Sequence, residues 1–181
     1  MLDDLESVLY TSEQLQSRIG EVGAQISRDY AQTHPLVIGV LKGAFVFLSD
    51  LVRHIDIPIE IDFIATSSYG SSTQSSGAVR MLKDLDQPAE GRDILLVEDI
   101  VDTGTTLNYL RDTLIRRGAR SVKIASAFDK PSRRRIPIVP DYCCFTVPNA
   151  FLVGYGLDYA ERYRHLSCVG ILRPEIYTDE H

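Results

Sequence analysis

The chain lacks the cysteines, the basic charge and the long apolar runs that mark several classes of protein. Only three cysteines occur among its 181 residues, too few for a disulfide framework, and none forms a Cys-x-x-Cys zinc motif. The formal net charge of −6 argues against a nucleic-acid-binding surface. No apolar run approaches the roughly 20 residues of a membrane-spanning helix, and the acidic N-terminus is neither a secretory signal nor a transit peptide. We therefore expect a cytoplasmic protein with neither a nucleic-acid nor a membrane partner.

The composition is that of an ordinary globular domain, with 44% apolar and 24% charged residues. Strand-like segments alternate with helix-like segments, which predicts an α/β fold. The first helix is expected to begin at Thr11, because its spacing to Gln14 predicts a capping box. No repeat or linker divides the chain, so we expect a single domain over residues 1–181. Because the chain is acidic, an anionic substrate would need local Lys, Arg, backbone N–H groups or a metal.

The most informative stretch is residues 94–106, ILLVEDIVDTGTT. Its apolar run suits a buried parallel strand, and leucines at helical spacing follow it. The loop between them would lie at the carboxyl end of a central strand, where α/β sheets bind ligands, with free N–H groups at a helix N-terminus. We expect its Thr/Gly turn to bind a phosphate, and Glu98 and Asp99 to bind ribose hydroxyls or Mg²⁺. Together these features predict a sugar phosphate site.

Asp, Thr and Gly also occur in ordinary βα loops, because they cap helices and make turns. The order found here is more specific. Two acids followed closely by Asp-Thr-Gly-x-Thr resemble the phosphoribosyl-pyrophosphate motif of the purine phosphoribosyltransferases, and the stretch lacks both the P-loop ending and a Gly-x-Gly-x-x-Gly fingerprint. Asp102, just beyond the acidic pair, is a candidate acid/base residue for a purine ring proton.

A similar strand–loop–helix unit precedes this motif. Residues 35–41 are expected to form a buried strand that ends at Lys42 and Gly43, and residues 44–55 an apolar helix. A Lys-Gly pair at a strand end is often only a turn. Beside a sugar pyrophosphate it becomes a candidate for binding the leaving group, through the ammonium and the loop backbone.

Between these units lies a segment rich in serine and glycine. Residues 57–65 and 78–83 read as strands, whereas the segment joining them has almost nothing to bury. Composition alone is compatible with a passive hairpin loop. We favour a lid over about residues 66–80, because Tyr69 is an unusual residue for a passive tip and the chemistry would benefit from excluding water.

The last third of the chain holds candidates for binding a flat ring. A strand over residues 121–128 is followed by Lys130, a candidate ligand contact, and then by the arginine run 133–135, which we assign to a solvated face. Residues 151–159 form either a core strand with a bend or a wall on which a heterocycle stacks, with Asp158 near it for a metal. A short strand and a polar tail end the chain.

Taken together, five ordered blocks resemble the hypoxanthine-guanine phosphoribosyltransferases, and the bacterial hypoxanthine enzymes most closely. The blocks are LKG, SSYGS, LVEDIVDTGTT, DKPSRR and VGYGLDYAERYRHL. The resemblance implies the type I phosphoribosyltransferase fold: a mainly parallel central sheet flanked by helices, a small hood from the chain ends including about residues 146–181, and a flexible lid. It also implies a homodimer or homotetramer. The implied reaction is purine salvage, in which hypoxanthine or guanine displaces pyrophosphate from 5-phosphoribosyl 1-pyrophosphate with Mg²⁺ required.

The resemblance also implies a role for each matching residue. Glu98 and Asp99 face the ribose hydroxyls and a metal, and Asp158 is a ligand of a second Mg²⁺. Lys130 reads the 6-oxo group of the base, and Phe151 stacks on its ring. The other implied substrate contacts are the 5′-phosphate loop Thr103, Gly104, Thr105 and Thr106, the pyrophosphate contacts Lys42, Gly43 and Arg164, the lid residues Ser68 and Tyr69, and the ring-edge contact Leu152.

Two alternatives from other classes remain open at the level of sequence. A phosphoribosyltransferase-like regulator that binds RNA or DNA would need a basic face, which the net charge does not favour. A receiver-type signalling domain would also place carboxylates at strand ends, but it leaves Lys42, Gly43 and Phe151 unexplained.

Thr105 stands where the common vertebrate enzyme has Lys, at a position that varies among bacterial members.

Overall fold

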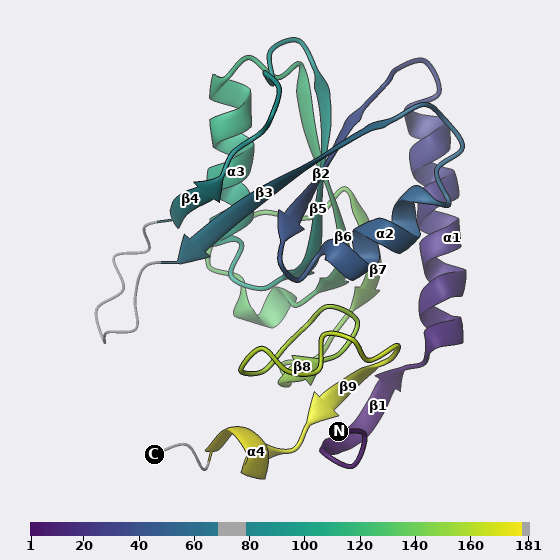
Figure 1. Cartoon of the computed structure of the whole chain (residues 1–181), viewed down its shortest axis with the longest axis vertical. Coiled ribbons are helices and arrows are strands. Elements are labelled where there is room, and N and C mark those ends of the chain that lie inside the picture. The colour runs from purple at the N-terminus through teal and green to yellow at the C-terminus, as the bar shows by residue number, and fades with distance from the viewer. Residues whose placement is uncertain (69–78, 179–181) are drawn as a thin grey trace.

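The computed structural model describes residues 1–68 and 79–178, and it is built around a six-stranded sheet (Figure 1). The strand order is β4-β3-β2-β5-β6-β7, and all neighbouring pairs are parallel except β3 and β4. The strands are β2 Leu36–Leu41, β3 Glu60–Ser68, β4 Val79–Lys83, β5 Asp93–Val101, β6 Ser121–Asp129 and β7 Tyr142–Thr146. The predicted mainly parallel α/β sheet is confirmed.

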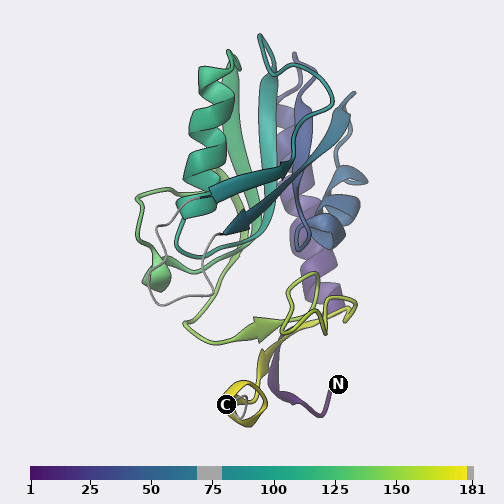
Figure 2. The ribbon, with the colours of Figure 1, turned by 60° about the vertical axis from the view of Figure 1, so that its left-hand side comes forward.

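Helices cover both faces of this sheet (Figures 1 and 2). Helices α1 Ser12–Asp29 and α2 Phe45–Val52 pack on one face, and α3 Thr105–Arg116 packs on the other. Alternate side chains of β5 serve the two layers, because successive residues of a strand point to opposite faces. Among the described residues, no helix combines the length and the apolar character needed to cross a membrane.

The predicted capping box at the start of α1 is confirmed. Thr11 Oγ1 accepts a hydrogen bond from the Gln14 backbone N–H at 3.4 Å, and Gln14 Oε1 accepts one from the Thr11 N–H at 2.9 Å. These two bonds satisfy N–H groups that have no partner inside the helix. The predicted helix over residues 44–55 is shorter than expected, since α2 ends at Val52.

A second, three-stranded sheet joins the two ends of the chain and lies beyond the carboxyl ends of the parallel strands (Figures 1 and 2). Its order is β1-β9-β8, with β1 at Leu5–Tyr10, β8 at Leu152–Val153 and β9 at Val169–Leu172. Strand β1 was not predicted. Within the predicted polar tail, Pro174–Thr178 forms the short helix α4, which was not predicted.

Two predicted boundaries also change. The acids Glu98 and Asp99 belong to β5, which runs to Val101, so the strand does not end where the apolar run does. Strand β3 extends to Ser68, the first of the two residues matched to the lid. Tyr69 and the rest of the proposed lid, up to residue 78, lie outside the described residues.

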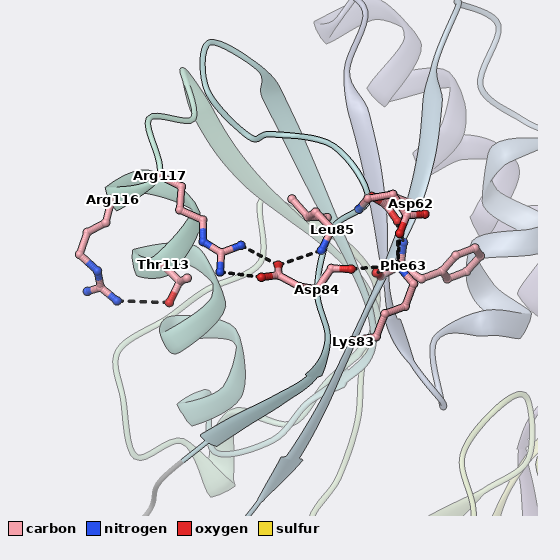
Figure 3. Close-up of polar contacts among 9 residues, drawn as sticks. Asp62, Phe63, Lys83, Asp84, Leu85, Thr113, Arg116 and Arg117 are labelled. Atoms are coloured by element: carbon pink, nitrogen blue, oxygen red, sulfur yellow. Dashed lines mark hydrogen bonds and ion pairs between the residues drawn. The ribbon is translucent and has the colours of Figure 1, made fainter.

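A polar network fastens the edge strand β4 to its neighbours (Figure 3). Asp62 is 6% exposed and accepts hydrogen bonds from the backbone N–H groups of Phe63 (2.7 Å) and Asp86 (2.8 Å) and from Lys83 Nζ (3.2 Å). Burial alone would raise the pKa of Asp62, but these donors outweigh it and lower that pKa. Arg117, at the end of α3, binds Asp84 through both terminal nitrogens at 2.6 and 2.8 Å. The two strands that border residues 69–78 are therefore held on the sheet.

Candidate active site

The predicted site residues gather at the carboxyl ends of three adjacent parallel strands. Lys42 follows β2, Glu98 and Asp99 lie near the end of β5 with Asp102 just beyond it, and Lys130 follows β6. Because β2, β5 and β6 are neighbours in the sheet, their ends meet at one edge, which is where open α/β sheets bind ligands. Residues up to 119 positions apart in sequence come into contact here, as Lys42 and Glu161 do.

Glu98, which is buried, and Asp99, which is half-buried, form a pair of neighbouring carboxyl groups. The Asp99 backbone N–H donates to Glu98 Oε1 at 3.2 Å, and the Ile100 N–H donates to Asp99 Oδ1 at 2.6 Å. Burial raises the pKa of Glu98 well above its ordinary value, and the neighbouring Asp99 charge raises it further. Burial also raises the pKa of Asp99. Two acids that resist ionising together are a site that a cation or a hydroxyl donor stabilises.

The loop after β5 forms a small cavity at the start of α3. Gly104 is the N-cap of α3 and has φ 83°, a conformation that residues other than glycine rarely adopt. A cavity of about 160 Å³ is lined by Glu98, Asp99, Ile100, Val101, Asp102, Thr103, Gly104, Thr106 and Leu107. Of the four residues predicted to bind phosphate, three line this cavity and Thr105 does not. The first turn of a helix offers unpaired N–H groups and a favourable dipole to an anion.

A second cavity of about 530 Å³ adjoins the first, a volume within the usual range for a small-molecule site. It is lined by Asp99, Ile100, Asp102, Lys130, Arg133, Asn149, Ala150, Phe151, Leu152, Leu157, Asp158 and Tyr177. Asp99, Ile100 and Asp102 line both cavities. The two hollows therefore share a wall, and that wall carries the acids.

Lys130 is held at the edge of the larger cavity. It is 9% exposed, and its Nζ donates to the Ala150 carbonyl at 2.8 Å. Burial lowers the pKa of Lys130. Phe151 is 37% exposed, so an aromatic face is available at the same cavity. A fixed ammonium donor beside an aromatic ring suits a flat heterocycle that carries an oxo group.

The arginine run departs from the predicted solvated face at two positions. Arg133 is exposed, but it lines the larger cavity, and its Nε lies 3.4 Å from Asp102 Oδ1. Arg134, which follows the 3₁₀ helix Pro131–Arg133, does not lie on a solvated face: its side chain is only 14% exposed and forms an ion pair with Asp129. Arg133 and Tyr177 were both missed as site residues. Their sequence surroundings, a charge run and a polar tail, held no signal for either.

A glutamate joins the two cations expected to bind pyrophosphate. Glu161 Oε2 lies 3.1 Å from Lys42 Nζ and 3.4 Å from Arg164 Nη2. Its hydrogen bond with Lys42 lowers the pKa of Glu161. Arg164 also donates to the Gly156 carbonyl at 2.9 Å and forms an ion pair with Asp158 at 2.9 Å. Its Nε is buried and has no protein acceptor within residues 1–68 and 79–178.

Two glycines let three segments meet in van der Waals contact. A Cβ on Gly43 would lie 1.5 Å from Asp99 Oδ2, and a Cβ on Gly156 would lie 2.1 Å from the Gly43 carbonyl oxygen. The Lys42 loop is thus wedged between the acidic pair and the segment that leads to Asp158. Any side chain at Gly43 would displace Asp99 or the loop.

The described residues contain no cluster of three or more His, Cys, Asp or Glu side chains able to enclose a metal. Mg²⁺ is commonly bound by only one or two carboxylates together with substrate phosphates and water. The neighbouring carboxylate groups of Glu98 and Asp99 fit that pattern. Asp158, the third predicted ligand, is occupied by Arg164 and by the Glu161 N–H at 2.9 Å.

Comparisons with known proteins agree over most of the chain. The model of the phosphoribosyl transferase domain family matches residues 7–160. The chain is 52% identical over 177 residues to the hypoxanthine-guanine phosphoribosyltransferase of Bacillus subtilis, covering 98% of each chain. It is 51% identical to that of Streptococcus agalactiae over 97% of this chain and 98% of the relative. A crystal structure of a hypoxanthine phosphoribosyltransferase from Staphylococcus aureus is similar with a TM-score of 0.94 and 45% identity, covering 99% of this chain and 97% of that one.

Proposed function

The chain belongs to the hypoxanthine-guanine phosphoribosyltransferase family, and from this premise we propose that it transfers the 5-phosphoribosyl group of 5-phosphoribosyl 1-pyrophosphate to N9 of hypoxanthine or guanine. The products are the purine nucleoside monophosphate and pyrophosphate, so the reaction is one of purine salvage. Family membership rules out the receiver-type interpretation. The main support for the proposed use of the site is that Asp99 and Asp102 line both cavities.

The larger cavity is proposed to hold the purine. Lys130 donates to the 6-oxo group, Phe151 stacks on the ring, and the backbone of Leu152 contacts the ring edge. The position and burial of Lys130 support its role, because its ammonium has three N–H donors, and an oxo group can accept from one besides the donor bound to the Ala150 carbonyl. The choice among hypoxanthine, guanine and xanthine depends on the backbone near Leu152 and Asp158.

The smaller cavity is proposed to hold the sugar phosphate. Thr103, Gly104, Thr105 and Thr106 bind the 5′-phosphate at the N-terminus of α3, and the acidic pair accepts hydrogen bonds from the ribose hydroxyls. Lys42, the backbone of Gly43 and Arg164 bind the pyrophosphate. The buried Nε of Arg164 supports this assignment, because it is a donor still lacking an acceptor in the described structure.

Mg²⁺ is the proposed cofactor, held by Glu98 and Asp99 and, for a second ion, by Asp158. Bound there, it would neutralise charge on the sugar pyrophosphate. Asp158 would have to exchange its ion pair with Arg164 for the metal. Arg164 would then be free for the pyrophosphate, so the two proposed roles are compatible.

In the proposed reaction the bond between ribose C1 and the pyrophosphate oxygen breaks, and a bond from purine N9 to C1 forms. The electron pair of the broken bond leaves with the pyrophosphate, where Lys42 and Arg164 stabilise it. The ribose acquires positive character, which the carboxylates of Glu98 and Asp99 in the same cavity favour. The purine loses a ring proton, and Asp102, on the wall between the two cavities, accepts it.

A spectrophotometric assay tests the proposal. The purified protein, sugar pyrophosphate and Mg²⁺ are combined with hypoxanthine, guanine or xanthine in turn, and nucleotide formation is expected with hypoxanthine and guanine. If no 6-oxopurine is turned over, the proposal is overturned.

The proposal includes a cytoplasmic location, in keeping with three unpaired cysteines, and a homodimer or homotetramer, which sedimentation measures directly.

A further inference from the structure

Three aromatic side chains gather at one side of the larger cavity. The ring centroids of Phe151 and Tyr177 lie 4.9 Å apart with an interplanar angle of 23°, a stacked pair. Tyr159 meets Phe151 edge-on at 5.5 Å and Tyr177 at 6.5 Å. Only Phe151 matches the family's stacking position. Tyr177 comes from α4, at the end of the chain.

Tyr177 belongs to the cavity as well as to the aromatic cluster. It lines the same hollow as Phe151, Lys130 and Asp102. It also packs, with its neighbour Ile176, against the core of the second sheet, formed by Leu5, Val153, Tyr163 and Leu172. Helix α4 is thereby fixed on the sheet that carries Phe151's neighbour Leu152, and the Tyr177 ring is presented to Phe151.

Phe151 needs such a support. It is more than one-third exposed and directly precedes the two-residue strand β8, and its ring has an edge-on contact with Tyr159 and a stacked contact with Tyr177. An unrestrained ring must lose rotamer freedom when a ligand stacks on it, which weakens binding. A stacked neighbour reduces that loss, because the ring is already ordered.

We propose that Tyr177 is a positioning residue for the purine: its ring holds Phe151 in the orientation that receives the base, and so raises the affinity for the base without touching the sugar pyrophosphate. This inference rests on the proposed function. It assigns to α4, which the sequence presents as a polar tail, one wall of the purine site.

Two substitutions of Tyr177 distinguish the stacking of its aromatic ring on Phe151 from its apolar packing against the second sheet. Tyr177→Leu keeps packing against the second sheet but removes the stack, and we expect the KM for hypoxanthine to rise about 2- to 10-fold, the loss of one aromatic pair. The KM for the sugar pyrophosphate and kcat should be unchanged. Tyr177→Phe keeps the stack and should behave as the unmodified enzyme.

Ile176→Ala is the matched control, because Ile176 lies on the same helix and packs against the same core but does not line the cavity. It should lower the thermal midpoint without changing the KM for hypoxanthine. The inference is overturned if Tyr177→Leu leaves that KM unchanged or lowers it, if Tyr177→Phe raises it equally, or if Ile176→Ala raises it as much. Turnover by the unmodified enzyme in the same assay keeps these outcomes distinct from failure of the proposed function.

Discussion

Nε of Arg133 lies 3.4 Å from Oδ1 of Asp102, so the proposed acid/base residue faces a cation from the next loop. That oxygen is buried, and no donor of the described structure makes a hydrogen bond to it. The contact with Arg133 is thus an ion pair without a hydrogen bond. Asp102 thus lines both cavities and has one oxygen that faces Arg133 and accepts no hydrogen bond from the described residues.

Asp102→Asn should lower kcat by roughly 10²- to 10⁴-fold, the usual contribution of general acid–base catalysis. The amide keeps the shape of the side chain but cannot accept the purine proton. The KM values for both substrates should change little, and steady-state kinetics measure all three quantities. Asp112→Asn, on the surface of α3, makes the same charge change as a control. An unaltered kcat for Asp102→Asn would remove that residue from its proposed role.

Gly43→Ala should lower kcat/KM by about 10²-fold or more, because displacing a reacting group by about 1 Å has that effect. The added Cβ would lie 1.5 Å from Asp99 Oδ2, so either the acid or the loop must move. Gly20→Ala, in α1, is the control, since its Cβ would come no closer than 3.7 Å to a neighbour. Equal activity of the two variants would contradict the close contact between the Lys42 loop and Asp99.

Glu98→Gln should make the metal-free protein more stable at neutral pH. Burial raises the pKa of Glu98 in the folded state, so the folded protein holds this proton more tightly than the unfolded chain does. Stability is therefore lost as the pH rises from the ordinary glutamate pKa, 4.5, through the raised value. Glutamine carries no charge and avoids that loss.

The measurement is the thermal midpoint against pH in the presence of a chelator. The midpoint of Glu98→Gln should exceed that of the unmodified protein above this window, by roughly 2–4 °C for each kcal/mol relieved, and converge with it below pH 4.5. Glu90→Gln, an exposed site, should show no such divergence. If the curve of Glu98→Gln stays parallel to that of the unmodified protein, Glu98 does not resist ionisation in the folded state.

Glu161→Gln should lower the KM for the sugar pyrophosphate by roughly 2- to 5-fold, the effect of removing one exposed ion pair. Glu161 binds both Lys42 and Arg164, which the pyrophosphate is proposed to recruit, so the substrate competes with this carboxylate. The difference from the unmodified enzyme should shrink at high ionic strength. Glu6→Gln, on exposed β1, controls for the change in net charge, and an equal fall of KM there would refute the competition.

Local sequence patterns predicted those elements that depend on interactions between residues close in sequence. The apolar run before Glu98, the leucine spacing of α3 and the Thr11–Gln14 capping box all act over a few residues, and each appears where predicted. Strand β1 was missed because its existence depends on pairing with β9, more than 150 residues later. No local pattern encodes such a partner.

The sequence by itself determined the α/β class, the family and the strand ends that carry the acids, Lys42 and Lys130. Only the tertiary structure decided which residues face one another: Arg133 toward Asp102, Glu161 between Lys42 and Arg164, Tyr177 on Phe151 and Asp99 against Gly43. The physical reason is the separation in sequence over which each interaction acts. Capping, periodicity and turn propensity are set within a few residues, whereas these contacts arise from the packing of segments far apart in the chain.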